Sequence, residues 1–141
     1  MSQENVEMLR SFYEAFNRGD IDAALAGAPP DFEIHDALER PDAGIHHGRE
    51  AARKAIESIS EPFDDLQVEP REFIEAGDEI IVIVHARGRG KGSGIPLDVE
   101  LAHVFTMQDG HMQVMRAYTS KASALEAAGL SEQDAHHSPP A

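Results

Sequence analysis

The order of the expected elements predicts an α+β fold. Helical periodicity dominates the first 60 residues, where apolar side chains recur every three or four positions. Strand-like runs fill most of residues 66–119, and the turns between them are short. Because a parallel pair needs a crossover of a dozen or more residues, these strands must be antiparallel. Helices gathered early and an antiparallel meander gathered late are typical of one α+β domain, with a bent sheet wrapped around helices.

Three helices are expected before the meander. The first presents an apolar face at helical spacing, formed by Val6, Leu9, Phe12, Tyr13 and Phe16. It ends at Gly19, after which Asp20 is expected to cap a short second helix that stops at Gly27. A third helix is expected from Gly48 to Pro62, since its alanine and isoleucine side chains share one side.

The strands follow from period-two alternation and turn residues. Residues 32–36 alternate between apolar and polar and predict a short strand, whereas residues 38–47 are expected to form an irregular loop. Longer strands are expected at residues 66–75, 79–89, 97–107 and 112–119. Ser120 then caps a last short helix that Gly129 ends. We expect one folded domain over residues 1–130 and a disordered tail over residues 131–141.

Composition argues against several classes of partner and chemistry. The 26 acidic residues against 12 Lys and Arg give a net charge of −14, which disfavours nucleic acids and anionic membranes as partners. The chain has no cysteine, so it has no thiol nucleophile or thiolate metal site. Its acidic start does not resemble a signal peptide, and its longest strongly apolar run, residues 80–84, is too short to span a membrane. A cytoplasmic protein is expected.

Several motifs, taken in order, resemble the SnoaL-like branch of the nuclear transport factor 2-like superfamily. They are residues 12–23, 30–36, 47–51, 102–106, 109–110, 118 and 124–130. The resemblance implies a cone-shaped α+β barrel, also called cystatin-like, in which helices and a curved sheet enclose one apolar pocket. It further implies a small apolar metabolite as ligand and a homodimer formed through the outer sheet face. Relatives include polyketide cyclases, ketosteroid isomerase and scytalone dehydratase, so the fold alone does not define the reaction.

Asp36 and Glu100 are the candidate catalytic residues. A carboxylate at the mouth of an apolar cavity has a raised pKa and can move protons next to a carbonyl. By resemblance, Asp36 falls where ketosteroid isomerase keeps its general base; alternatively, Asp36 caps the following loop while His35 faces solvent. If Glu100 points into the cup, the two carboxylates form an acid–base pair. The alternative for Glu100 is a solvated strand charge.

The residues expected to line the substrate pocket are Phe12, Tyr13, Phe16, His35, Ala102, Met115, Arg116 and Tyr118. Arg116 and Tyr118 can bind an anionic or carbonyl oxygen, or they can pair across neighbouring strands. The resemblance aligns the isomerase's oxyanion-hole tyrosine and aspartate with Phe12 and Ala102, whose side chains donate no hydrogen bond. It aligns an aspartate of the cyclases with Ser120.

The histidines and glycines do not predict a cofactor. The adjacent pairs His46-His47 and His136-His137 lack the spacing by which a helix presents two metal ligands. His85 and His103 can approach each other across strands, or each can be satisfied by a different neighbour. The glycine-rich run at residues 88–94 leads into a strand, which favours a hairpin tip over a phosphate site. We therefore expect no metal and no cofactor.

The expected activity is that of a cofactor-free isomerase, cyclase or dehydratase. The alternative is a non-catalytic ligand carrier or dimerisation module.

Overall fold

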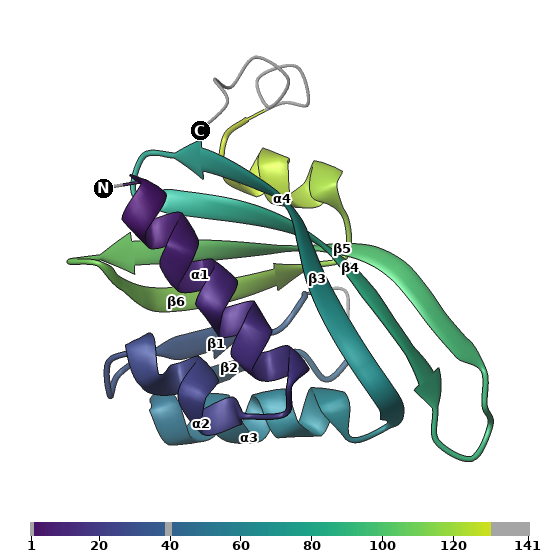
Figure 1. The fold of residues 1–141 in the computed structure, drawn as a ribbon. Coiled ribbons are helices and arrows are strands. Elements are labelled where there is room, and N and C mark those ends of the chain that lie inside the picture. The colour runs from purple at the N-terminus through teal and green to yellow at the C-terminus, as the bar shows by residue number, and fades with distance from the viewer. Residues whose placement is uncertain (1, 39–40, 131–141) are drawn as a thin grey trace.

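The chain folds around one six-stranded curved sheet, an α+β architecture as predicted (Figure 1). The computed structural model describes residues 2–38 and 41–130, and the tail expected at 131–141 lies outside the described residues. The helical elements are α1 (Ser2–Asn17), α2 (Ile21–Ala24), the 3-10 turn η1 (Leu25–Gly27), α3 (Arg49–Ser60) and α4 (Lys121–Ala127). The strands are β1 (Glu33–His35), β2 (Ile45–His47), β3 (Phe63–Ala76), β4 (Glu79–Gly90), β5 (Pro96–Gln108) and β6 (His111–Tyr118).

The sheet has the order β2-β1-β6-β5-β4-β3. The four long strands form the predicted antiparallel meander, and β1 joins it by pairing parallel with β6. The prediction of an irregular loop over residues 38–47 is wrong at its end, because Ile45–His47 forms β2 and pairs with β1. Three residues at a sheet edge are too few to show a period of two, so alternation could not predict this strand.

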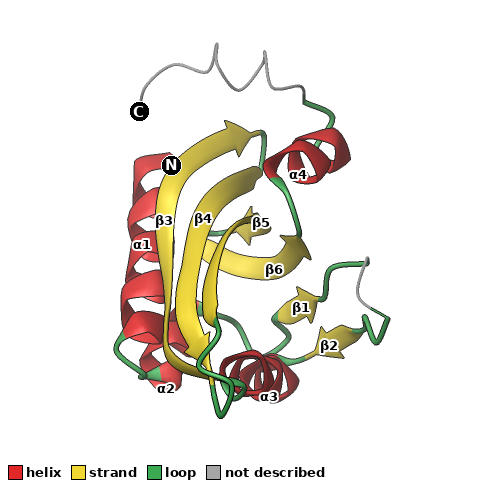
Figure 2. Cartoon of the chain, turned by 90° about the vertical axis from the view of Figure 1, so that its right-hand side faces the viewer, coloured by secondary structure: helices red, strands yellow, loops and turns green. Residues whose placement is uncertain are grey.

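The concave and convex faces of the sheet are covered by different helices (Figure 2). Along β4, Ile80, Val82 and Val84 pack into the main core with α1 and α3, whereas Ile81 and Ile83 pack under α4. Successive strand residues point to opposite faces, so a strand buried on both sides is a continuous apolar run. Residues 80–84 are that run.

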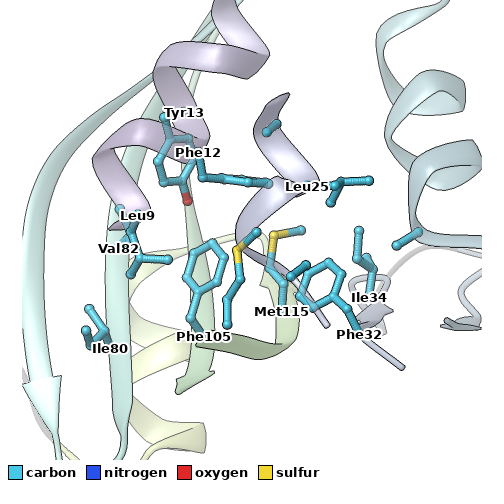
Figure 3. Packing of buried hydrophobic residues seen from close by; sticks show 14 of the residues in the cluster. Leu9, Phe12, Tyr13, Leu25, Phe32, Ile34, Ile80, Val82, Phe105 and Met115 are labelled. Carbon is cyan, nitrogen blue, oxygen red and sulfur yellow. The ribbon is translucent and has the colours of Figure 1, made fainter. Parts of the chain in front are cut away.

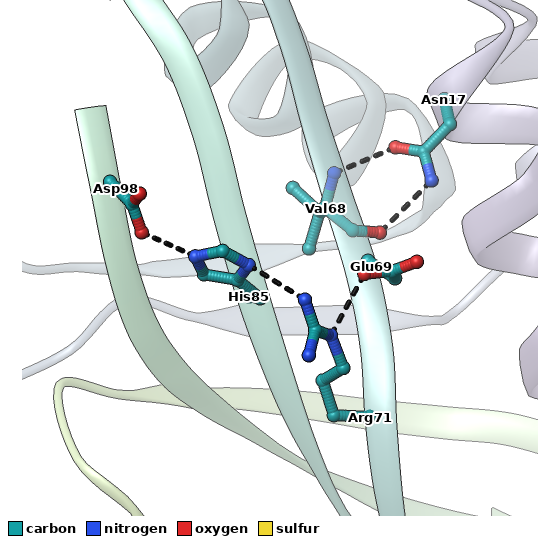
Figure 4. Close-up of polar contacts among 6 residues, drawn as sticks. All are labelled: Asn17, Val68, Glu69, Arg71, His85 and Asp98. Atoms are coloured by element: carbon teal, nitrogen blue, oxygen red, sulfur yellow. Dashed lines mark hydrogen bonds and ion pairs between the residues drawn. The ribbon is translucent and has the colours of Figure 1, made fainter. Parts of the chain in front are cut away.

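The C-terminal end of α1 is fixed to β3 through Asn17. The Asn17 amide donates to the Val68 carbonyl oxygen at 3.0 Å and its oxygen accepts from the Val68 amide at 2.8 Å (Figure 4). Gly19, with φ of 81°, then ends the helix as predicted, and Asp20 caps α2 by accepting from the Ala23 amide. These contacts hold the aromatic face of α1 against the concave side of the sheet.

The convex face is partly covered and partly charged. Ala124 and Leu125 of α4 cover the apolar half, and Ser120 caps this helix as predicted. The other half carries a polar chain in which His85 bonds to Asp98 and to Arg71, and Arg71 bonds to Glu69 (Figure 4). Within the described residues, α4 of the same chain thus buries the apolar part of this face.

Within the described ranges, no helix is both long enough and apolar enough to span a membrane.

Candidate functional site

An apolar pocket of about 340 Å³ opens between α1, α3 and the concave face of the sheet. Its walls come from both helices and from β3 to β6. The lining residues are Phe12, Tyr13, Phe16, Ile56, Ile59, Phe63, Leu66, Val68, Ala86, Leu97, Val99, Leu101, His103 and Met115. We call this cavity the apolar pocket. Four residues predicted to bind substrate, Phe12, Tyr13, Phe16 and Met115, lie on its wall.

Aromatic rings from α1 and β5 form a packed cluster beside the apolar pocket (Figure 3). Phe12 meets Tyr13 edge-on with ring centroids 5.2 Å apart, and Phe105 lies edge-on to Phe12 at 5.8 Å. Phe105 has no exposed surface. Edge-to-face pairs add specific geometry to apolar burial, so this wall is expected to keep its shape without a ligand.

A single hydrogen bond joins the two polar side chains of the apolar pocket. The Tyr13 hydroxyl lies 2.7 Å from Nδ1 of His103, and the two rings are nearly parallel. Burial lowers the pKa of His103 from 6.5 to about 4, so the imidazole is neutral at pH 7. Burial also raises the pKa of Tyr13 well above 10.0, so its hydroxyl keeps the proton. The pair is neutral and hydrogen-bonded inside an apolar enclosure.

This pair lies one residue beyond the positions that the resemblance indicated. Phe12 and Ala102 were aligned with oxyanion-hole residues, but Tyr13 and His103 are the side chains that meet at the apolar pocket. Ala102 lies on the other face of β5, buried under α4, so its assignment to the substrate pocket is corrected. His103 was missed as a site residue. The signal that could have found it is the alternation that groups it with Leu101 and Phe105.

Glu100 does not face the apolar pocket. It is exposed, and its neighbour Leu101 is the residue that lines the cavity. The alternation along β5 places Glu100 on the convex face with Asp98. The expected pairing of Glu100 with Asp36 is therefore corrected, and the solvated strand charge describes Glu100 instead.

A second cavity lies where β1 and β6 end. It is lined by His35, Asp36, Leu38, Ala43, Gly44, Ile45, Arg116, Ala117 and Tyr118, and we call it the polar pocket. The expectation that Asp36 lies at the mouth of the apolar cavity is thus corrected, because Asp36 lines the polar pocket. Its carboxylate accepts from Nε2 of His46 at 3.0 Å and from the Gly44 amide at 3.3 Å. With the Asp36 amide donating to the Gly44 carbonyl, these bonds close the loop, as the alternative reading of Asp36 required.

The other predicted polar residues also lie at the polar pocket. Arg116 donates from Nη1 to Thr106 Oγ1 at 3.0 Å and lies 3.6 Å from the Glu79 carboxylate, which is the cross-strand pairing given as its alternative role. His35 pairs with Glu33 at 3.0 Å. Hydrogen bonds to His35 and His47 lower the pKa of Glu33. Tyr118 lines the cavity next to Ala117.

The histidines of the meander are separated by the sheet itself. His85 belongs to the charged convex face and His103 to the apolar pocket, so these two side chains do not approach each other. Each bonds to a different neighbour, His85 to Asp98 and His103 to Tyr13, as the alternative expectation required. In the part of the chain that the structure describes, no group of three His, Asp or Glu residues is placed to hold a metal ion.

Comparison with known proteins identifies the family. The sequence profile of the SnoaL-like domain matches residues 9–115, while no curated protein sequence matches the chain. The fold is similar to a protein of Jannaschia whose name assigns it to the SnoaL-like polyketide cyclases, at 25% identity and a TM-score of 0.72, covering 98% of this chain and 94% of that one.

Two nuclear transport factor 2-like proteins of Burkholderia are also similar. The protein of B. xenovorans is 30% identical with a TM-score of 0.69, covering 89% of this chain and 95% of that one. The protein of B. pseudomallei, described as of unknown function, is 25% identical with a TM-score of 0.72, covering 87% and 95%. The profile match spans most of the helices and strands described above, and the chain therefore belongs to the SnoaL-like domain family.

Proposed function

We propose that this protein binds a small, mostly apolar molecule in the apolar pocket and holds the ligand's polar atom with His103. The observation that carries the proposal is the composition of the wall, on which Tyr13 and His103 are the polar residues among those described. A concave, largely preformed apolar site with a few convergent polar groups is the usual form of a small-molecule site. Its volume of about 340 Å³ lies within the usual range for such sites.

The chemistry of the apolar pocket favours binding over proton abstraction. A general base works best with a pKa near the working pH, whereas the pKa of His103 is about 4. The described lining contains no carboxylate. A neutral imidazole is instead suited to donating a hydrogen bond to a carbonyl or to a developing oxyanion. The pocket can therefore hold and polarise a carbonyl ligand with the residues it has.

Acid–base catalysis of an isomerisation, cyclisation or dehydration is the second candidate. It is favoured by the position of Asp36 on the polar pocket, hydrogen-bonded to His46. Strand β6 contributes to both cavities, since Met115 lines the apolar pocket and Arg116 the polar pocket. A ligand bound in the polar pocket would place a reacting carbon near the Asp36 carboxylate. The cyclase name of the similar Jannaschia protein supports the same class of reaction.

The binding proposal is tested by filling the apolar pocket. Ala86 is buried on the wall, so Ala86→Phe places a ring inside the cavity. The probe is prodan, a neutral naphthyl ketone whose emission moves to shorter wavelength in apolar surroundings. We expect prodan to bind the wild type and to bind Ala86→Phe at least about tenfold more weakly, since the apolar contacts are lost. Ala43→Phe, at the polar pocket, is the matched control and should bind as the wild type does.

Equal binding of prodan by the wild type and Ala86→Phe would contradict the proposal. Melting curves show whether Ala86→Phe is folded, and Ala86→Leu offers a smaller obstruction with an intermediate effect.

The second candidate function, acid–base catalysis, is tested by turnover of a panel of ketones and epoxides. Catalysis predicts product formation that Asp36→Asn abolishes, whereas a carrier predicts recovery of unchanged ligand.

A further inference from the structure

The hydrogen bond between Tyr13 and His103 has a direction that follows from what else each group can bond. Tyr13 is only 1% exposed, and within the described residues its hydroxyl bonds to Nδ1 of His103 alone. If Nδ1 carried the imidazole proton, it would donate to the tyrosine oxygen and the buried hydroxyl proton would have no acceptor. A buried donor without a partner costs free energy, so the tyrosine hydroxyl is the donor and Nδ1 the acceptor.

The other ring nitrogen of His103 then carries the proton. A neutral imidazole has one protonated nitrogen, so an accepting Nδ1 leaves the proton on Nε2. The hydrogen bond of His103 is made by Nδ1, so Nε2 has no partner within the described protein. Every buried side-chain nitrogen or oxygen of the described residues does have a partner. Nε2 must therefore keep accessible surface, and the cavity that His103 lines is the apolar pocket. Nε2–H of His103 is thus a hydrogen-bond donor available to a ligand in the apolar pocket.

The charge of the surroundings decides which acceptor suits this donor. No Lys or Arg is among the residues that line the apolar pocket, and the whole chain carries a net charge of −14. A carboxylate buried there would meet one neutral donor and no cation, and burying an unpaired charge is very unfavourable. An uncharged carbonyl oxygen, in contrast, is satisfied by a single hydrogen bond.

We propose that Tyr13 is a positioning residue that fixes the Nε2–H form of His103, so that the pocket selects uncharged ligands with a hydrogen-bond acceptor, such as ketones, aldehydes and esters, over carboxylates. This selectivity rests on the proposed function, because it applies to a ligand in the apolar pocket. The orientation of the Tyr13–His103 bond is a property of the protein alone and is open to measurement without a ligand.

The orientation is tested by nitrogen-15 NMR of the full chain labelled on histidine. We expect His103 to show a protonated Nε2 and an unprotonated, hydrogen-bonded Nδ1 at pH 7. In Tyr13→Phe, Nδ1 loses its donor and the two tautomers should both become populated. A proton on Nδ1 in the wild type would overturn the proposal, whether or not any ligand binds.

The selectivity is tested by calorimetry with three naphthalenes of similar shape: 2-acetylnaphthalene, its hydrocarbon analogue 2-isopropenylnaphthalene, and 2-naphthoate. The measured quantity is the ratio of ketone to hydrocarbon affinity, which cancels the shared apolar contacts. We expect this ratio to fall roughly three- to tenfold in His103→Leu, the range of one net hydrogen bond, and partly in Tyr13→Phe. Phe16→Leu alters the same wall without touching the hydrogen bond and should keep the ratio.

The outcomes separate the two proposals. Naphthoate should bind the wild type at least about tenfold more weakly than the ketone at pH 7, as an unpaired buried charge requires. A ketone-to-hydrocarbon ratio that is equal in the wild type and His103→Leu would overturn the selectivity and leave apolar binding intact. So would naphthoate binding as tightly as the ketone. Failure of all three ligands to bind would overturn the proposed function itself.

Discussion

The apolar and polar pockets adjoin the same strand, β6, yet they are built in opposite ways. The apolar pocket draws its wall from α1, α3 and the four consecutive strands β3 to β6. The polar pocket is formed by the end of β1, the loop after it and the end of β6. One histidine at each pocket shows how these surroundings differ. His103 is half-buried among apolar groups, and burial lowers its pKa to about 4, whereas His46, whose side chain is 32% exposed, bonds to the Asp36 carboxylate.

The largest expected effect is a loss of stability when a side chain packed beside the apolar pocket is removed. Phe105 has no exposed surface and packs edge-on against Phe12 and Tyr13. We expect Phe105→Ala to lower the free energy of unfolding by about 3–5 kcal/mol, because apolar contacts are lost and a cavity is left. Ile45, which is 53% exposed at the polar pocket, is the control, and Ile45→Ala should change it by less than about 0.5 kcal/mol. Urea denaturation measures both, and similar losses would contradict this contrast.

The second effect is a pH dependence that originates in the apolar pocket. The pKa of His103 is 6.5 in an ordinary setting and about 4 in the folded protein. Between these values the unfolded chain binds more protons, so the stability of the fold falls as the pH drops from 6.5 to 4. A shift of this size corresponds to at most about 3 kcal/mol. Urea denaturation at several pH values should show this slope in the wild type and a flatter one in His103→Gln.

Two surface carboxyls titrate in a different window. A hydrogen bond to His35 lowers the pKa of Glu33, and one to His85 lowers the pKa of Asp98. A carboxyl group whose pKa is lowered on folding stabilises the fold at pH values above its ordinary pKa, which is 4.5 for Glu33 and 3.8 for Asp98. This stabilisation is lost as the pH falls below that value. The part of the slope above pH 4.5 that disappears in His103→Gln therefore reports on His103. Equal slopes for the wild type and His103→Gln would contradict its assignment to that residue.

The same contrast explains how far the sequence could predict the molecule. The meander was predictable because its strands alternate and its turns are short, and the hairpin at Asp109-Gly110 is one example. The caps at Asp20 and Ser120 were predictable because a helix N-terminus needs a side-chain acceptor close in sequence. These features depend on local interactions, which a single sequence contains.

The site was less predictable because its decisive contact is not local. Tyr13 and His103 are 90 residues apart, and neither residue alone indicates a pair. Motif resemblance directed attention to Asp36, and Glu100 was a candidate only if it pointed into the cup. A shift of one strand residue exchanges the two faces of a sheet. Glu100 and Ala102 were assigned to the cup for that reason, whereas Leu101 and His103 face it. Knowledge of one inward residue on β5 would have placed all four residues on the correct face.

A third and smaller effect is expected at the polar pocket. The Asp36 side chain is 8% exposed and holds its loop through His46 and the Gly44 amide. Removing these hydrogen bonds in Asp36→Ala should lower the free energy of unfolding by about 1 kcal/mol. Prodan affinity should stay within about twofold of the wild type, since Asp36 does not line the apolar pocket. A tenfold loss of prodan binding would show that the two cavities act as one site.

The smallest expected effect concerns Arg116, the residue after Met115 on β6. Because neighbouring strand residues face opposite sides, Met115 lines the apolar pocket while Arg116 bonds to Thr106 and approaches Glu79. Arg116→Gln should lower the free energy of unfolding by less than about 1 kcal/mol, as expected for a partly exposed pair, and prodan affinity should not change. Met115→Ala is the matched variant, and it should weaken prodan binding by enlarging the cavity. If Arg116→Gln weakened prodan binding as much as Met115→Ala, a cation would act at the ligand, and the division of β6 between an apolar and a polar pocket would be wrong.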